Sequence, residues 1–155
     1  MKIALCSDEA YAVHRTITRI IEARGHAAVV FGAFGGGPEA PWAPVAEAAA
    51  LAVARGECDE GIFLCWSGTG IAMAANKVSG VRAALCWDPG GAAAARVWNH
   101  ANALCLSNRA LSDDMAGEIL AAWFESEPGE RGAEGVALLE AVDHRHRRPG
   151  GEGGE

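Results

Sequence analysis

The chain has 155 residues, half of them hydrophobic, so it can bury the core of one domain but is too short for two ordinary ones. Its formal net charge of −7 argues against nucleic acid or an anionic membrane as the main partner. No apolar run approaches the roughly 18 residues that a membrane span needs, and the N-terminus turns polar too soon for a signal peptide. We therefore expect a cytoplasmic protein that binds neither nucleic acid nor membrane.

Short apolar runs alternate with helical patterns along the chain. The runs predict five strands, over Lys2–Cys6, Ala27–Phe31, Gly61–Leu64, Val81–Cys86 and Ala103–Leu106. The helical patterns predict six helices, at about Tyr11–Arg24, Pro44–Arg55, Gly70–Lys77, Gly91–Asn99, Ser112–Glu125 and Arg131–Asp143. Residues 1–143 are thus expected to form a single domain. Residues 144–155 have no apolar periodicity and are expected to be a disordered tail.

Strands that alternate with helices predict an α/β fold with three layers. The middle layer is a five-stranded parallel, Rossmann-like sheet, and helices cover both of its faces. Ligands of such sheets bind beyond the carboxyl ends of the strands, where we expect Ser7 with Asp8, the segment Cys65–Gly70, and Asp88 to converge. The Gly- and Pro-rich loop from Gly32 to Pro44 is either a lid or pocket wall, or a plain surface connection.

The segment Cys65-Trp66-Ser67-Gly68-Thr69-Gly70 carries the strongest chemical signal. It follows the apolar third strand and precedes a helical pattern of small residues. A glycine-rich turn exposes backbone N–H groups, and a helix N-terminus favours negative charge, so the thiol lies where both act on it. A buried, inert cysteine before a tight turn is the structural alternative.

Three other chemistries fit this loop less well. A cysteine phosphatase needs an arginine at the sixth position after the nucleophile, where this chain has Ile71. A P-loop needs a Gly-Lys-Ser/Thr end, which is absent. A dinucleotide site can be drawn from Gly68-x-Gly70, Ala74 and Asp88, but Cys65 would crowd the phosphate and no room is left for a catalytic domain.

Proton transfer beside a carbonyl suits the loop better. The isomerisation of an aldose to a ketose needs a base that moves a proton between adjacent carbons, and donors for the enediolate oxygen. Cys65 can be the base, and the Ser67 hydroxyl can relay protons. The backbone N–H groups of Ser67 and of the following residues can be the donors, which makes an anion hole of Gly68, Thr69 and Gly70.

The loop and the segment after it resemble the family of type B ribose-5-phosphate isomerases and galactose-6-phosphate isomerases. Cys65–Lys77 has the sequence CWSGTGIAMAANK, and Gly80-Val81-Arg82-Ala83-Ala84 follows it. Three further segments agree in order: Met1-Lys2-Ile3-Ala4 with Ser7-Asp8, Arg24-Gly25-His26 before Phe31-Gly32, and Asn99 with Asn102 before the last strand. The resemblance covers about residues 1–131.

This resemblance implies a five-stranded parallel α/β sandwich that works as a dimer or tetramer, with active sites at the subunit interface and neither cofactor nor metal. It implies that Cys65 is the base and that Ser67–Gly70 form the anion hole. Asp8 and Asn99 are then substrate contacts, and Arg109 and Arg131 stand at positions of the family's phosphate clamp. Asn76 and Lys77 belong to the motif and are expected to have structural roles.

Three positions depart from the family's pattern, and two of them, Glu9 and Trp98, are still expected to contact the substrate. Glu9 replaces a histidine in the first loop and adds a negative charge near the expected phosphate site. Trp98 stands where the family has the histidine that assists ring opening, and His100 would point about 200° away from it on a helix. Gly135 replaces the second arginine of the clamp in the last helix.

The cysteines and the remaining histidines give weaker signals. The five cysteines, at positions 6, 58, 65, 86 and 105, contain no Cys-x-x-Cys pair, which favours reduced thiols over a disulfide frame or a zinc site. A metal site of three thiols, from Cys6, Cys65 and Cys86, is an alternative, because all three fall near strand ends. We expect His14 and His26 to be surface or cap residues.

These observations favour an aldose–ketose isomerase that works through an enediolate. Its expected substrate is a pentose phosphate, converted from ribose 5-phosphate to ribulose 5-phosphate, or a related sugar phosphate. Two alternatives stay open because of Glu9, Trp98 and Gly135. One is the isomerisation or epimerisation of a different or non-phosphorylated sugar; the other is a catalytically incomplete sugar-binding or partner subunit.

Overall fold

A five-stranded sheet forms the middle layer of the protein, for which a computed structural model describes residues 1–146. All strands are parallel, and their order is β2-β1-β3-β5-β4. The strands are β1 (Lys2–Ser7), β2 (Ala27–Gly32), β3 (Glu60–Cys65), β4 (Ala83–Leu85) and β5 (Ala103–Ser107). The strand order reverses between β1 and β3, which is where parallel sheets bind ligands.

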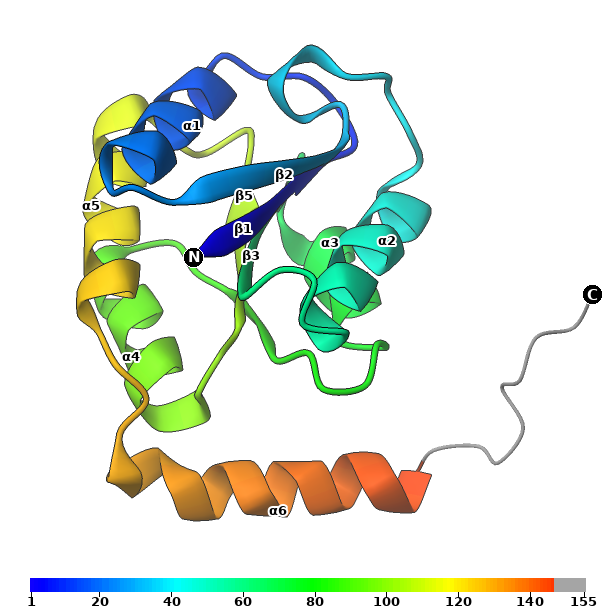
Figure 1. The fold of residues 1–155 in the computed structure, drawn as a ribbon, viewed down its shortest axis with the longest axis vertical. Coiled ribbons are helices and arrows are strands. Elements are labelled where there is room, and N and C mark those ends of the chain that lie inside the picture. Colours follow the sequence, from blue (N-terminus) through cyan, green and yellow to red (C-terminus); the bar gives the residue numbers. More distant parts are fainter. Residues whose placement is uncertain (147–155) are drawn as a thin grey trace, which may run out of the picture.

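Helices cover both faces of the sheet, as Figure 1 shows. One face carries α1 (Val13–Ala23), α4 (Pro89–Asn99) and α5 (Asp113–Glu125). The other carries α2 (Trp42–Ala54) and α3 (Thr69–Ala75), and a 3-10 turn, η1 (Phe34–Gly36), follows β2. The expected three-layer α/β fold is confirmed.

The two cores follow from the alternation of side chains along the strands. Leu5, Ile62 and Leu104 point to the face of α1, α4 and α5, whereas Cys6, Phe63 and Cys105 lie in one row across the other face. All of these side chains are fully buried. Residues next to each other in sequence therefore serve opposite cores, which fixes the register of β1, β3 and β5.

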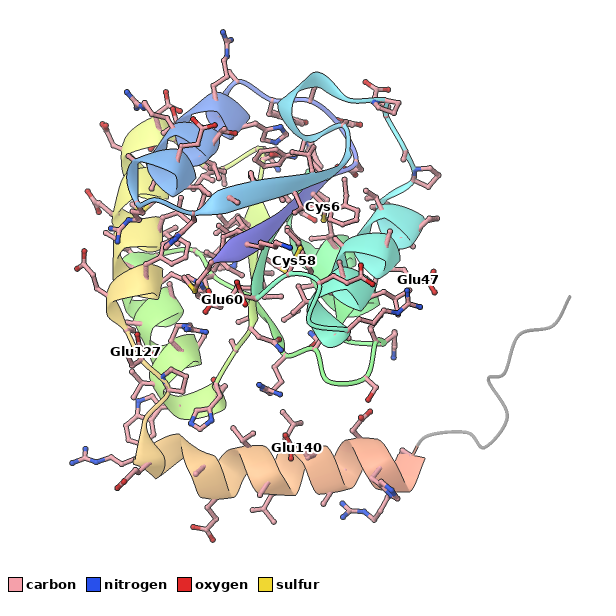
Figure 2. The ribbon with its side chains drawn as sticks, in the orientation of Figure 1. Cys6, Glu47, Cys58, Glu60, Glu127 and Glu140 are labelled. Carbon is pink, nitrogen blue, oxygen red and sulfur yellow. The ribbon has the colours of Figure 1, made fainter. Side chains whose placement is uncertain are left out.

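A buried ion pair joins the first face to the sheet at the start of β3. Arg96 of α4 lies 2.6 Å from the carboxylate of Glu60, and the Trp123 indole donates to the other carboxylate oxygen at 2.7 Å. Figure 2 labels Glu60 at this end of the sheet. The pair ties β3, α4 and α5 together at the edge opposite to the strands' carboxyl ends.

The limits of several elements differ from those expected. Strand β4 is shorter than Val81–Cys86, and at its start side chains take the N–H groups: Arg82 N–H donates to Asn102 Oδ1 and Ala83 N–H to Asn76 Oδ1. The Asn76 amide also donates to the Ala72 and Ala83 carbonyls, so its expected structural role is confirmed.

Helix α6 (Glu130–His146) stands apart from the three layers and packs on the end of α4 (Figure 1). Only Gly132 and Val136 of α6 are buried, and Glu140, on the side toward the body of the molecule, lies 3.9 Å from Arg82 (Figure 2). Leu138, Leu139 and Val142 are exposed. The helix includes the first three residues of the expected tail, whose remainder, 147–155, lies outside the described residues.

Within residues 1–146, no helix is long and apolar enough to cross a membrane.

Candidate active site

The loop after β3 is fixed to the loop after β5 by hydrogen bonds. The Cys65 carbonyl accepts the Asn108 N–H at 2.9 Å, and the Trp66 carbonyl accepts the Arg109 N–H at 3.2 Å and the Ser107 hydroxyl at 2.8 Å. Cys65 itself is 5% exposed. The thiol expected to be the base thus lies at the carboxyl end of a central strand, on a backbone held from the neighbouring strand.

Gly68 makes the sharp turn between this strand and helix α3. Its φ of +77° is a conformation that residues with a Cβ rarely adopt. A Cβ there would also lie 2.5 Å from the Leu85 side chain and 2.9 Å from the Leu106 carbonyl group. Only glycine fits this position, and it allows the chain to enter α3 at Thr69 directly beside Cys65.

The start of α3 gathers backbone and hydroxyl donors. The N–H groups of a helix's first turn have no carbonyl partner within the helix. Thr69 N–H lies 3.4 Å from Ser67 Oγ, and the Ser67 and Thr69 hydroxyls are 2.6 Å apart. The residues expected to form the anion hole therefore lie in one turn with the expected proton-relay hydroxyl.

Asp8 and Glu9 line a pocket of about 350 Å³ beyond the end of β1, together with Glu39 and Trp42. Burial is the main cause that raises the pKa of Asp8, and the nearby Glu9 and Glu39 carboxylates raise it further. Ala40 N–H donates to the Asp8 carbonyl at 3.2 Å. The loop from Gly32 to Pro44 is thus a pocket wall, the first of its two interpretations.

Trp42 connects this pocket to the Cys65 loop. Its indole packs over Gly70, where an added Cβ would lie 3.2 Å from the ring. The side chain is 45% exposed, so one part of the ring stays open to a ligand. In the same loop, the exposed Trp66 ring has its centre 4.7 Å from the Arg109 guanidinium, a cation–π contact. Arg109 therefore brings a positive charge to the loop after β3.

His14 is buried beneath the loops at the carboxyl ends of the strands, so the prediction that it is a surface or cap residue is wrong. It is 1% exposed, its ring stacks on Phe34 at 4.3 Å, and its Nε2 lies 2.9 Å from Asn108 Oδ1. The signal was present in the sequence: His14, Ile17 and Ile21 follow the helical spacing of the buried face of α1.

The remaining site candidates, Trp98, Asn99 and Arg131, lie at the other edge of the sheet. They belong to the end of α4 and the start of α6, which pack closely at Gly132: an added Cβ there would lie 2.7 Å from the Trp98 carbonyl. His100 ends α4, and its Nε2 lies 2.9 Å from the Gly129 carbonyl. The length of β3, about 16 Å at the usual rise of a parallel strand, separates this edge from Cys65.

Two alternatives from the sequence are excluded by geometry. Asp88 caps α4 by accepting the Gly91 N–H at 2.8 Å, so it is not free as the ribose-binding acid of a dinucleotide site. Cys86 packs in the core of α1, α4 and α5, whereas Cys6 and Cys65 lie on the opposite face, so these three thiols do not converge. Burial raises the pKa of Cys86 to about 11.

Comparison with known proteins gives consistent matches. A family model described as Ribose/Galactose Isomerase matches residues 3–139. The chain belongs to this family. Ribose-5-P isomerase B of Listeria innocua is 31% identical over 149 residues, which are 95% of this chain and 100% of that protein. D-erythrulose-4-phosphate isomerase of Pectobacterium atrosepticum is 32% identical over 149 residues, 95% of this chain and 98% of that protein.

A solved structure agrees as closely. Ribose-5-phosphate isomerase B of Clostridium thermocellum superposes with a TM-score of 0.88 at 36% identity, over 95% of this chain and 100% of that one. The family, the fold and the enzyme class expected from the sequence, an aldose–ketose isomerase of sugar phosphates, are thereby confirmed.

Proposed function

We propose that Cys65 is the base of this isomerase and that its first candidate substrate is ribose 5-phosphate, converted to ribulose 5-phosphate. The observation that carries the proposal is the thiol at the buried end of β3, next to the N–H groups of the first turn of α3. Oxygen charge that develops beside a base needs such donors, and fixed donors need no reorganisation during the reaction.

The proposed reaction moves one proton along the open-chain sugar. Cys65 removes the proton from C2 of the aldose, and the resulting enediolate carries its negative charge on the oxygen at C1. The N–H groups of Gly68, Thr69 and Gly70 stabilise this charge. The hydroxyl pair of Ser67 and Thr69 moves a proton between the two oxygens, and Cys65 returns its proton to C1, which yields the ketose.

We further propose that two copies of the chain complete each site. Trp98, Asn99 and Arg131 are too far from the Cys65 of their own subunit to reach the same sugar. A second copy can supply them, as the resemblance implies for a homodimer or tetramer. The exposed Leu138, Leu139 and Val142 of α6 support such an assembly, because a helix with an open apolar stripe is stabilised by burying it.

The charges around the site bear on the choice of substrate. Arg109 and Arg131 favour a phosphate group, while Asp8, Glu9 and Glu39 repel one from the pocket beyond β1. The phosphate is therefore expected near the arginines, and an uncharged part of the sugar near Asp8. The four-carbon sugar phosphate in the name of the Pectobacterium relative makes a shorter substrate the second candidate.

The test is exchange of the transferred hydrogen with solvent deuterium, followed by NMR. We expect the purified protein to exchange the C2 hydrogen of ribose 5-phosphate, and Cys65→Ala to lose this exchange while keeping its fold. Cys58→Ala is the matched control, because Cys58 is buried just before β3, away from the loop, and its loss should leave exchange unchanged.

The same assay separates the alternatives. Exchange with ribose or galactose, but not with the phosphate of either sugar, would show that the substrate is a non-phosphorylated sugar. Absence of exchange with pentoses, hexoses, tetroses and all their phosphates would contradict isomerase activity of this chain alone and favour an incomplete partner subunit.

A further inference from the structure

A closed chain of hydrogen bonds lies under the pocket edge and involves residues to which the proposed reaction gives no role. It runs from the Tyr11 N–H through His14, Asn108 and Ser7 to the Glu9 carbonyl. Both ends of the chain are therefore on the loop that follows β1, which carries Asp8. Its middle, Asn108, is on the loop that follows β5.

The geometry fixes the direction of every bond in the chain. His14 Nδ1 faces the Tyr11 N–H at 3.5 Å and so is the acceptor, which leaves the ring proton on Nε2. Nε2 then donates to Asn108 Oδ1 at 2.9 Å, and Asn108 Nδ2 donates to Ser7 Oγ at 3.0 Å. The Ser7 hydroxyl donates to the Glu9 carbonyl at 2.7 Å.

The surroundings of His14 hold it in this neutral, oriented form. Its ring is stacked on Phe34 with an angle of 8° between the planes, so the ring cannot turn without leaving that contact. Burial lowers the pKa of His14, which keeps Nδ1 free to accept. Ser7 is fully buried and Asn108 nearly so, so water does not compete for these bonds.

Asn108 also connects this hydrogen-bond chain to Cys65, the expected base. Its backbone N–H donates to the Cys65 carbonyl at 2.9 Å, so one residue touches the Cys65 loop through its backbone and the Asp8 loop through its side chain. A leucine at position 14 would fill an apolar core at lower desolvation cost. What the polar chain adds is a fixed position of the Asp8 loop relative to Cys65.

We propose that His14 is a positioning residue of this isomerase: through Asn108 and Ser7 it holds the Asp8 loop in place against the Cys65 loop. This inference rests on the proposed function for its effect on turnover, and on the hydrogen-bond chain alone for its effect on the loop. The hydrogen-bond chain acts on the loop proposed to bind the sugar and leaves the backbone of Cys65 in place. Loss of these hydrogen bonds should therefore change KM and not kcat.

Steady-state kinetics test the inference with three variants. His14→Leu removes both hydrogen bonds of the ring, and His14→Gln keeps a donor for Asn108. Ile17→Val removes one methylene from the same buried face of α1 and leaves the hydrogen-bond chain intact. We expect His14→Leu to raise KM about fivefold, the effect of one net hydrogen bond, with kcat within about twofold. His14→Gln should recover part of this loss, and Ile17→Val should leave KM and kcat unchanged.

A double-mutant cycle adds a second kinetic criterion. If His14 acts through Asn108, the double variant His14→Leu with Asn108→Ser should raise KM no more than the worse single change does. Multiplied effects of the two changes, or a His14→Leu protein that loses thermal stability but keeps its KM, would overturn the inference and leave His14 as a core residue only.

Amide hydrogen exchange gives a result that does not depend on activity. In His14→Leu the amides of residues 9–11 should exchange faster, while those of α1 from Ile17 onward stay protected. If the wild-type protein isomerises none of the sugars, the proposed function fails and this measurement still decides the inference about the loop. Unchanged exchange at residues 9–11 would overturn it.

Discussion

His14 shows how strongly its surroundings determine the state of a single side chain. Buried between Phe34 and Asn108, it has a lowered pKa, because the charged imidazolium would lose its hydration there. The unfolded chain keeps the ordinary value of 6.5. The unfolded state therefore binds a proton that the folded state does not, at every pH between the lowered value and 6.5.

The stability of the protein should depend on pH for this reason. The contribution of His14 is fully present above pH 6.5 and is lost as the pH falls from there toward its folded pKa. Denaturant unfolding of the wild type and of His14→Gln at a series of pH values measures it: the wild type should lose more stability on acidification below about pH 6.5. The raised pKa values of Asp8 and Glu60 change the stability with pH in the opposite direction from His14. Their effect is the same in both proteins, so it cancels when the two stability curves are subtracted. Parallel curves for the two proteins would show that His14 titrates normally.

Residues of the site differ in how far the sequence reveals them. Cys65, Ser67 and Gly68 follow one another along the chain, so their chemistry is visible in a local pattern. His14 and Asn108 meet only in the fold, 94 positions apart. A polar residue on the buried face of a helix was the available signal, and only the structure shows that its partner lies beside the Cys65 loop.

At the level of elements, we expect the turn from β3 into α3 to decide whether the proposed site forms. Gly68→Ala should lower the free energy of unfolding by about 1–3 kcal/mol, because it combines a left-handed backbone with contacts to Leu85 and Leu106. Gly25→Ala is the matched control: its φ of +74° is similar, but nothing lies within 4 Å of an added Cβ.

Denaturant unfolding and kcat together check this prediction. Gly25→Ala should cost only the backbone strain, about 1 kcal/mol, and leave kcat unchanged, whereas Gly68→Ala should also lower kcat by displacing the N–H donors beside Cys65. Equal losses of stability in the two variants, with kcat retained in both, would contradict the role given to this turn.

Helix α6 offers a gain-of-function test of the proposed phosphate clamp. Gly135 lies one turn after Arg131 and has open space around it, so an arginine fits there without a clash. Gly135→Arg should lower KM for a phosphorylated sugar about tenfold, the value of one charge-assisted hydrogen bond. It should not lower KM for the corresponding free sugar.

Gly135→Gln is the control for this change, because it gives the same gain in helix propensity without the charge. Both variants should raise thermal stability slightly, and only the arginine should act on KM. An unchanged KM in Gly135→Arg would show that the phosphate does not reach the start of α6.

The elements themselves were largely predictable from the sequence, since apolar runs and helical patterns are local. Their limits were not. Strand β4 begins at Ala83 and not at Val81, where Asn76 and Asn102, from other segments, take the N–H groups of Ala83 and Arg82. Helix α2 begins at Trp42 and not at Pro44, and this places the indole over Gly70. Such limits depend on contacts that no local pattern contains.

For the molecule as a whole, the main feature is that the expected site residues form two groups at opposite edges of the sheet. Cys65, Asp8 and Arg109 lie at the carboxyl ends of the strands, and Asn99 and Arg131 lie where α4 meets α6. No sequence pattern measures this separation, although the resemblance implied a site at an interface. A complete site of the proposed kind therefore needs a second copy whose α4–α6 end meets the Cys65 edge of the first.

Mixing two inactive variants shows whether a site is shared between subunits. One carries Cys65→Ala, and the other carries Asn99→Ala with Arg131→Ala. In an equimolar mixture half of the dimers are mixed, and each of these has one site without any substitution, so isomerase activity should return to about one quarter of the wild-type value. Mixed dimers that native mass spectrometry detects, but that are no more active than either variant alone, would contradict a site shared between subunits.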